Sequence, residues 1–376
     1  MQRVDGSERD DWRLTAAKVG FNFHTIDDKR YWDETAYYAL SLEEIEQRIE
    51  APSAEIEAMC LELIDEVIDD ERQLRRLQIP EAFWPMIAAS WERDDPSLYG
   101  RLDLSFDGTG PAKLLEYNAD TPTSLLESAV CQWYWMEDKF PSADQFNSIH
   151  DRLVARWRQL PGDNPIHLAS LDGNEEDWAC TTYLIDTVAQ AGRQGEHINI
   201  EEIGWDPSRS TFVDTQGSAI GQLFKLYPWE WMMADEFGVH IAASSTQFIE
   251  PLWKAGLSCK GLLPILWELF PDHPNLLPAY FEPGRLSSYA KKPLYSREGA
   301  NIELYAKNAR LQNADGPYGA QGYIYQALQI PPAFDGRYPV IGSWVIDGQS
   351  AGMCIREDSS PITSNSSSFV PHYFIN

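Results

Sequence analysis

The sequence predicts a mixed α/β fold with antiparallel sheets and a helical layer near the N-terminus. Apolar residues recur at helical spacing between residues 41 and 67, helical segments alternate with short strand-like runs between about residues 125 and 225, and the C-terminal part is mostly strand-like. No repeat, low-complexity linker or charge block marks a domain boundary in the 376 residues. We therefore expect one compact unit with subdomains.

The helical layer begins at Ser41. Ser41 and Glu44 have the spacing of a capping box, and apolar residues follow at helical intervals, at Ile56, Met59, Cys60, Leu63, Ile64 and Val67. Pro52 is expected to break the layer into two helices. Because Asp and Glu occupy the opposite faces, we interpret the layer as a solvated scaffold that packs on the core.

A β-hairpin is expected between residues 99 and 118. The run RLDLSF alternates, GTG supplies a turn, and KLLEYN alternates again before ADTPTS ends the pattern. This hairpin carries several polar side chains, which are considered below.

The rest of the chain predicts two kinds of sheet. SLLESAVCQWYWMEDKF and WACTTYLIDTVAQAG have helical patterns and alternate with the strand-like PIHLASL and HINIEEI, which is typical of an α/β layer and makes parallel strands a reasonable expectation. Towards the C-terminus, SYAKKPLYSREGANIELYA indicates a strand, a glycine loop and a second strand. YIYQALQI and YPVIGSWVIDGQSAGMCIRED follow, so this half is expected to be mostly antiparallel.

Composition and charge exclude some partners. Lys and Arg number 30 against 58 Asp and Glu, a formal net charge of −28, so a polyanion such as nucleic acid would be repelled from most of the surface. The same charge would attract a cationic substrate, although solubility is the more common reason for an acidic surface. No N-terminal apolar segment and no run of about 18 apolar residues is present, so a cytoplasmic location without membrane contact is expected.

The cysteines and histidines indicate no metal centre. The five cysteines are widely spaced without a CxxC pair, and the seven histidines show no HExxH pattern. We expect reduced, mostly buried thiols. A GxSxG nucleophile elbow and a local catalytic-cysteine signature are also absent from the sequence.

The first candidate site lies on the hairpin. Arg101 and Asp103 are two residues apart on one strand, and Glu116 and Asn118 are two apart on the next, so each pair projects from a single face. Carboxylate and amide oxygens suit Mg²⁺, and arginine offers a charge-assisted fork for phosphate or carboxylate. The alternative is an exposed sheet face with cross-strand ion pairs, and spacing alone does not decide between the two.

The second candidate set is distributed over the C-terminal half. Lys292 precedes the loop of residues 294–301, whose backbone N–H groups could cover phosphates, while Lys260 starts an apolar helix and Arg356 ends a strand. Each also has a simpler explanation: a hairpin turn, a solvated lysine or a surface turn.

Five segments together resemble the synthetase domain of bacterial glutathionylspermidine synthase and its stand-alone relatives. They are RLDLSFDGTGPAKLLEYNADTPTS, FKLYPWEWM, CKGLLPILWELFPDHPNLLPAYF, KPLYSREGANI and IREDSSPITS. The resemblance runs nearly end to end and implies one ATP-grasp-like synthetase domain over residues 1–376, with antiparallel sheets around a nucleotide cleft. It also implies that ATP phosphorylates a carboxylate before an amine attacks the acyl phosphate. Because the matching sequence begins almost at once, no amidase domain or activity is expected.

The resemblance also implies roles for single residues on the hairpin. Asp103, Glu116 and Asn118 match the Mg²⁺ ligands, with Asp103 also in the ATP-binding set. Arg101 matches the residue that steadies the acyl phosphate beside the nucleotide, and Arg356 matches a second ligand of anionic groups. Mg²⁺ and the arginines would then stabilise the charge of the transition state.

Further matches concern the nucleotide and the two other substrates. Lys260 and Lys292 match the lysines that clamp the nucleotide. Glu175 and Glu176 match the segment that meets the amine and the thiol peptide, and Thr121 falls where a small hydroxyl contacts the peptide. A carboxylate at 175 or 176 is a candidate for orienting the amine or taking up its proton.

Two departures leave the substrates open. Residues 226–228 are Leu-Tyr-Pro where a more polar run is expected, and the tail from Thr363 to Asn376 contains no Asp or Glu to hold a polyamine. The expected function is thus a carboxylate–amine ligase using ATP and Mg²⁺, possible substrates being a glutathione-like peptide and a polyamine. The alternative is a nucleotide-binding regulatory or interaction protein that kept the fold without turnover. The oligomeric state does not follow from the sequence.

Overall fold

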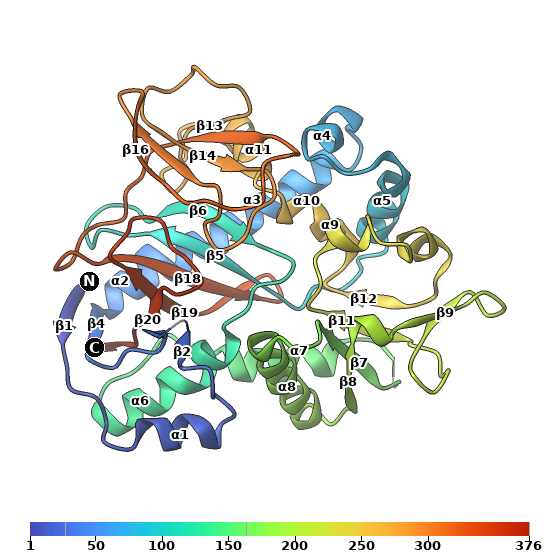
Figure 1. Ribbon diagram of the computed structural model, residues 1–376, viewed down its shortest axis with the longest axis horizontal. Coiled ribbons are helices and arrows are strands. Elements are labelled where there is room, and N and C mark those ends of the chain that lie inside the picture. The colour runs from blue at the N-terminus through green and yellow to red at the C-terminus, as the bar shows by residue number, and fades with distance from the viewer. Residues whose placement is uncertain (27, 163, 376) are drawn as a thin grey trace.

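The computed structural model describes residues 1–26, 28–162 and 164–375. Figure 1 shows an antiparallel sheet through the middle of the molecule, a second antiparallel sheet above it, and a parallel sheet with its helices at the lower right. The N-terminal and C-terminal ends lie close together on the left. The expected mixed α/β class is confirmed.

The central sheet has the strand order β20-β19-β18-β5-β6 and is antiparallel throughout. Its strands are β5 (Tyr99–Ser105), β6 (Lys113–Asn118), β18 (Tyr338–Ile346), β19 (Gln349–Asp358) and β20 (Ser368–Phe369). The expected hairpin is β5 and β6. Every residue of β5 is buried because β5 lies between two other strands and both of its faces are covered.

The second antiparallel sheet has the order β13-β17-β14-β15-β16. Its strands are β13 (Ala279–Tyr280), β14 (Tyr289–Pro293), β15 (Glu303–Ala306), β16 (Ala309–Asn313) and β17 (Tyr323–Ala327). The expected strand, glycine loop and strand are β14, residues 294–302 and β15. Helix α11 (Leu262–Leu269) packs on β13 and β17.

The parallel sheet has the order β12-β11-β7-β8, which confirms parallel strands in the α/β region. Its strands are β7 (Ile166–Ser170), β8 (Gly195–Asn199), β11 (Gln222–Lys225) and β12 (Gln247–Ile249). Helix α8 (Glu175–Gln190) packs on β7 and β8, and α7 (Ile149–Gln159) packs on α8. Shorter elements around it are η4 (Ile200–Glu202), β9 (Gly204–Asp206), β10 (Thr211–Val213), α9 (Trp229–Met232), η5 (Gly238–Ala243), η6 (Leu252–Lys254) and α10 (Ala255–Ser258).

The helical layer runs without interruption from residue 42 to residue 67. It comprises α2 (Leu42–Glu44), a π-helical turn η1 (Ile45–Glu50) and α3 (Ala51–Val67), and both bonds of the capping box at Ser41 are present. The expected break at Pro52 is wrong. Pro52 lies in the first turn of α3, directly after the π-helical turn, where a missing N–H is tolerated.

The remaining elements surround these layers. A small sheet of β1 (Gln2–Asp5), β4 (Ala36–Ser41) and β21 (His372–Ile375) brings the two chain ends together. The others are α1 (Trp12–Lys18), β2 (Thr25–Ile26), β3 (Lys29–Arg30), α4 (Glu71–Arg76), η2 (Glu81–Phe83), α5 (Trp84–Glu92), η3 (Glu127–Cys131) and α6 (Gln132–Lys139).

The core consists of two large apolar clusters. One joins the helical layer to the central sheet, and the other joins the parallel sheet and its helices to the N-terminal aromatic residues. All five cysteines are buried free thiols, as expected. Among the described residues, no helix has both the length and the apolar character needed to cross a membrane.

Candidate functional site

A cavity of about 570 Å³ lies where residues of the three large sheets meet. Its wall includes residues of β5, β6 and β19 from the central sheet, of β14 and β17 from the second antiparallel sheet, and of the loops that follow β7 and β11. The carboxyl ends of parallel strands commonly border a ligand site. The expected ligand-binding side chains should therefore line this cavity.

The hairpin residues lie on one face of the central sheet, towards the cavity. Arg101 is paired with Asn118 and Asp103 with Glu116 in the strand register, and all four line the cavity. Arg101 is only 5% exposed and Asp103 only 3%. The alternative of an exposed sheet face with surface ion pairs is therefore excluded.

Asp103 is held by two arginines. Its Oδ1 lies 2.8 Å from Nε of Arg101, and its Oδ2 lies 3.0 Å from Nη2 of Arg356 on β19. The strand between them, β18, carries Gly342 directly opposite Asp103. A Cβ at Gly342 would lie 2.8 Å from Cδ of Arg101, so glycine is what lets this side chain cross the strand.

Lys260 and Lys292 face the hairpin from the second sheet and its helix. Nζ of Lys260 lies 3.1 Å from Oε2 of Glu116 and donates to the carbonyl of Ser296 at 2.8 Å. Nζ of Lys292 donates to Oε1 of Gln326 and to the carbonyl of Leu115, both at 2.7 Å. Both lysines line the cavity, so the structure brings the two candidate sets together.

The electrostatics of this wall favour bound anions. Burial would raise the pKa of Glu116, but Lys260 and Lys292 lower it to about 2. Burial lowers the pKa of Lys292 to about 8, against the opposing effect of Glu116. Two cations are thus held in a desolvated site, where they act more strongly on a phosphate than they would in water.

The donor set fits a metal that arrives with a nucleotide. No group of three or more His, Cys, Asp or Glu side chains in the described chain could hold a metal by itself. Asp103, Glu116 and Asn118 offer two carboxylates and one amide, and Mg²⁺ in such sites completes its shell with phosphate oxygens and water. Nδ2 of Asn118 is buried without a hydrogen-bond partner among the described residues, so it is available to donate to an acceptor such as a phosphate oxygen, while Oδ1 is the atom that would bind a metal.

The loop after β14 covers one side of the cavity. Residues 295–300 line it, and Oγ of Ser296 is buried without a hydrogen-bond partner in the described chain. Gly299 has φ of +69°, and a Cβ there would lie 2.3 Å from the carbonyl oxygen of Thr363, so only glycine fits. Arg297 is fixed by Glu230 on α9 at 2.8 Å. The loop therefore packs against both the C-terminal segment and the parallel-sheet unit.

The substrate side is acidic. Thr121 and Glu176 line the cavity, whereas Glu175 is exposed at the start of α8 and is not part of the lining. Asp177, the next residue, does line it. Burial and then Glu176 raise the pKa of Asp177 to about 7. The same two causes, in the same order, raise the pKa of the buried Glu127 to about 8.

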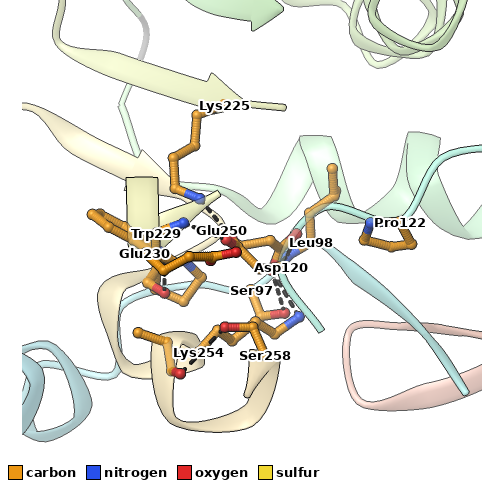
Figure 2. Close-up of polar contacts among 12 residues, drawn as sticks. Ser97, Leu98, Asp120, Pro122, Lys225, Trp229, Glu230, Glu250, Lys254 and Ser258 are labelled. Carbon is orange, nitrogen blue, oxygen red and sulfur yellow. Dashed lines mark hydrogen bonds and ion pairs between the residues drawn. The ribbon is translucent and has the colours of Figure 1, made fainter. Parts of the chain in front are cut away.

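Two buried ion pairs link the parallel-sheet region to the two ends of the hairpin (Figure 2). Lys225 at the end of β11 reaches Oδ1 of Asp120 at 2.5 Å, and the Trp229 N–H donates to the other oxygen at 2.8 Å. Glu250 pairs with Lys254 at 2.8 Å and also accepts from the backbone where β5 begins. These contacts join the parallel sheet to the hairpin, and Asp120 leads directly into the cavity-lining residues 121–124.

Several functional candidates were missed at the level of sequence. They are Asp120, Asp177, Glu230 and Arg297, which line the cavity, and Lys225, which pairs with Asp120. The available signals were weak: a lysine inside the apolar run FKLYP, and a third acidic residue after Glu175 and Glu176. Neither pattern shows which charge is buried.

Known proteins resemble the chain over its whole length. Residues 3–375 match the protein family described as "Glutathionylspermidine synthase preATP-grasp". The chain belongs to the glutathionylspermidine synthase family. The resemblance drawn from the five segments is thereby confirmed, and so is the enzyme class expected for this family, acid–amine ligase.

Individual relatives differ in size. A protein of Haemophilus influenzae named "Putative acid--amine ligase" is 42% identical over 395 residues and 100% of both chains. Trypanothione synthetase of Crithidia fasciculata is 27% identical, and the bifunctional glutathionylspermidine synthetase/amidase of Escherichia coli is 28% identical. These matches cover 92% and 90% of this chain but only 57% and 59% of the length of those two relatives.

A solved structure supports the fold. The glutathione synthetase-like effector of Globodera pallida superimposes with a TM-score of 0.61 over 98% of both chains, at 11% sequence identity. At this identity the likeness concerns the fold alone.

Proposed function

We propose that this protein is an ATP- and Mg²⁺-dependent acid–amine ligase that activates a carboxylate as an acyl phosphate and transfers the acyl group to an amine. One observation carries the proposal: a single cavity is lined by Arg101, Asp103, Glu116 and Asn118 of the hairpin together with Lys260 and Lys292, whose ammonium groups reach β6. This is the arrangement that an ATP-grasp-like nucleotide site requires. Membership of the glutathionylspermidine synthase family supports a ligase function.

The residues have separate tasks in this mechanism. Bound Mg²⁺ would supply charge neutralisation on the nucleotide phosphates, and Asp103, Glu116 and Asn118 are the side chains that would hold it. Lys260 and Lys292, whose ammonium groups lie beside the hairpin, would position the phosphates. Phosphoryl transfer depends mainly on such positioning and charge stabilisation, so little acid–base chemistry is required from the protein at this step.

Arg101 and Arg356 would act on the acyl phosphate. Both touch Asp103, so both guanidinium groups are held beside the proposed metal position. Burial would lower the pKa of Arg101, but Asp103 raises it overall, so this residue stays charged throughout. Two fixed cations can stabilise the negative charge that develops as the carboxylate attacks the phosphate and as the amine later attacks the carbonyl carbon.

The substrates belong to the acid and amine classes. Thr121 and Glu176 line the cavity and are proposed to meet the peptide-like acid and the amine. Glu175 was expected to share this role; its exposed position makes it at most a contact for an extended amine. Glutathione and spermidine, which the name of the E. coli relative suggests, are the first probes to try.

The direct test measures ADP release from Mg²⁺-ATP with a panel of carboxylates and amines that includes glutathione and spermidine. We expect ADP release that requires both an acid and an amine in the wild type and is lost in Asp103→Ala. Asp69→Ala, an exposed carboxylate outside the cavity, is the matched control and should behave like the wild type. ATP binding without amine-dependent ADP release for every pair would favour a regulatory nucleotide-binding protein instead.

A further inference from the structure

Asp177 is a buried carboxylate at the substrate side of the cavity. It lies in the first turn of α8, is 9% exposed, and lines the cavity. Its backbone N–H donates to Oδ1 of Asn174, which caps the helix, at 3.1 Å. In the described chain its carboxylate takes part in no ion pair and no hydrogen bond.

Glu176 and Glu298 also line the cavity without an ion pair or hydrogen bond in the described chain, but Glu176 is only half-buried and Glu298 is exposed. Four other acidic side chains of the cavity wall differ from Asp177 because each has a cationic partner. Asp103 is held by arginine at 2.8 and 3.0 Å, Glu116 by lysine at 3.1 Å, Asp120 by lysine at 2.5 Å, and Glu230 by arginine at 2.8 Å. These four carboxylates each lie within 3.1 Å of a lysine or arginine nitrogen, whereas the Asp177 carboxylate has no such partner in the described chain.

The groups around Asp177 connect it to the site of the acyl phosphate. Glu176 and Cys180 face it from its own helix, and Arg297 and Glu298 from the loop after β14. Glu298 also interacts electrostatically with Arg356, which touches Asp103. One continuous set of charges therefore runs from Asp177 to the arginine that is proposed to act on the acyl phosphate.

The balance of these charges suits a base at neutral pH. Burial is the largest effect that raises the pKa of Asp177 to about 7, the Glu176 carboxylate adds to it, and Arg297 opposes it. A base works best when its pKa lies near the working pH. The helix N-terminus supports the deprotonated form, so both protonation states are accessible.

We propose that Asp177 is the catalytic base that accepts the proton of the attacking amine. The inference rests on the proposed ligase function. An ammonium R–NH₃⁺ gives one proton to the carboxylate, and the freed nitrogen lone pair forms the C–N bond to the acyl carbon. The C–O bond to phosphate breaks with its electron pair on the phosphate, which takes the second proton lost by nitrogen. Asp177 then returns its proton to solvent.

Two nucleophiles separate this role from a structural one. Spermidine, or the panel amine with the highest turnover, is an ammonium at pH 7 and needs a base; hydroxylamine is largely neutral at pH 7 and does not. We expect Asp177→Asn to lose about 10²-fold in kcat/KM for the ammonium substrate. ADP release that depends on hydroxylamine should stay close to the wild-type rate, because the acyl phosphate still forms.

The pH profile gives an independent readout. In the wild type, kcat/KM for the amine should rise through an inflection near pH 7, and this inflection should be absent in Asp177→Asn. Asp186→Asn, an exposed residue of the same helix, is the control and should keep the wild-type profile. Equal losses with both nucleophiles, or an unchanged inflection, would overturn the assignment of Asp177 while leaving the ligase intact. A wild type that releases no ADP with any pair would overturn both.

Discussion

The buried pair of Lys225 and Asp120 should be a main support of the cavity wall. The Lys225 side chain is 0% exposed and that of Asp120 is 3% exposed, with 2.5 Å between the charged atoms. Lys225→Met removes the cation and leaves Asp120 buried, with the Trp229 N–H as its one remaining partner among the described residues. Removing one member of a buried pair typically lowers the free energy of unfolding by about 3–5 kcal/mol, because the remaining charge is uncompensated.

A matched exposed pair tests whether burial is the cause. Arg209 and Asp206 also lie 2.5 Å apart, but their side chains are 48% and 24% exposed. Arg209→Met should therefore change stability far less than Lys225→Met. The assay is urea unfolding followed by tryptophan fluorescence, with equal slopes required for the comparison.

The double variant Lys225→Met/Asp120→Asn completes the cycle. We expect it to be more stable than Lys225→Met alone, since no uncompensated charge stays buried. If Lys225→Met destabilised the protein no more than Arg209→Met, or if the double variant recovered nothing, the argument from burial would be refuted.

Three further outcomes follow from the same physical reasoning. Gly342→Ala places a methyl group 2.8 Å from Cδ of Arg101. We expect the free energy of unfolding to fall by about 1–3 kcal/mol. Because Arg101 is displaced, kcat should fall by a larger factor than KM for ATP changes. Burial lowers the pKa of His372 to about 3, below its unfolded value of about 6.5. The neutral form therefore stabilises the fold above pH 6.5, and this stabilisation is lost as the pH falls. His372→Gln should make the fall in Tm between pH 6.5 and pH 4 less steep. The pKa of Asp177 is raised to about 7 from an unfolded value near 4, so the stability of the fold decreases as the pH rises between these two values. Asp177→Asn should therefore raise Tm relative to the wild type at pH 8 but not at pH 4.

The sequence predicts local features well because they depend on nearby residues. The alternation of residues 99–118 identifies β5 and β6, and the two-residue spacing puts Arg101 and Asp103 on one face. The π-helical turn before Pro52 has no such local signal in the sequence, and it lies against β19, which is some 300 residues later in the chain.

Burial is what the sequence does not reveal about the site. Glu175, Glu176 and Asp177 are equivalent as a string, but the phase of α8 exposes the first, leaves the second half-buried and buries the third. In the sequence, Lys225 is an isolated lysine in an apolar strand. The structure shows its partner, Asp120, which lies 105 residues earlier in the chain. Long-range pairing decides both cases, and the resemblance to a family names positions without giving their surroundings.

The proposed ligase function depends most on one Mg²⁺-nucleotide site formed by the hairpin and the two lysines. The most direct test is calorimetric titration of the wild type and of Asn118→Ala with ATP, with and without Mg²⁺. The Asn118 side chain forms no hydrogen bond within the described chain, so its removal should have little structural effect. We expect the wild type to bind Mg²⁺-ATP more tightly than ATP alone, and Asn118→Ala to lose about tenfold, roughly 1.4 kcal/mol, for Mg²⁺-ATP only. Equal affinities for Mg²⁺-ATP in the two proteins, or a wild-type affinity that Mg²⁺ does not change, would contradict the account.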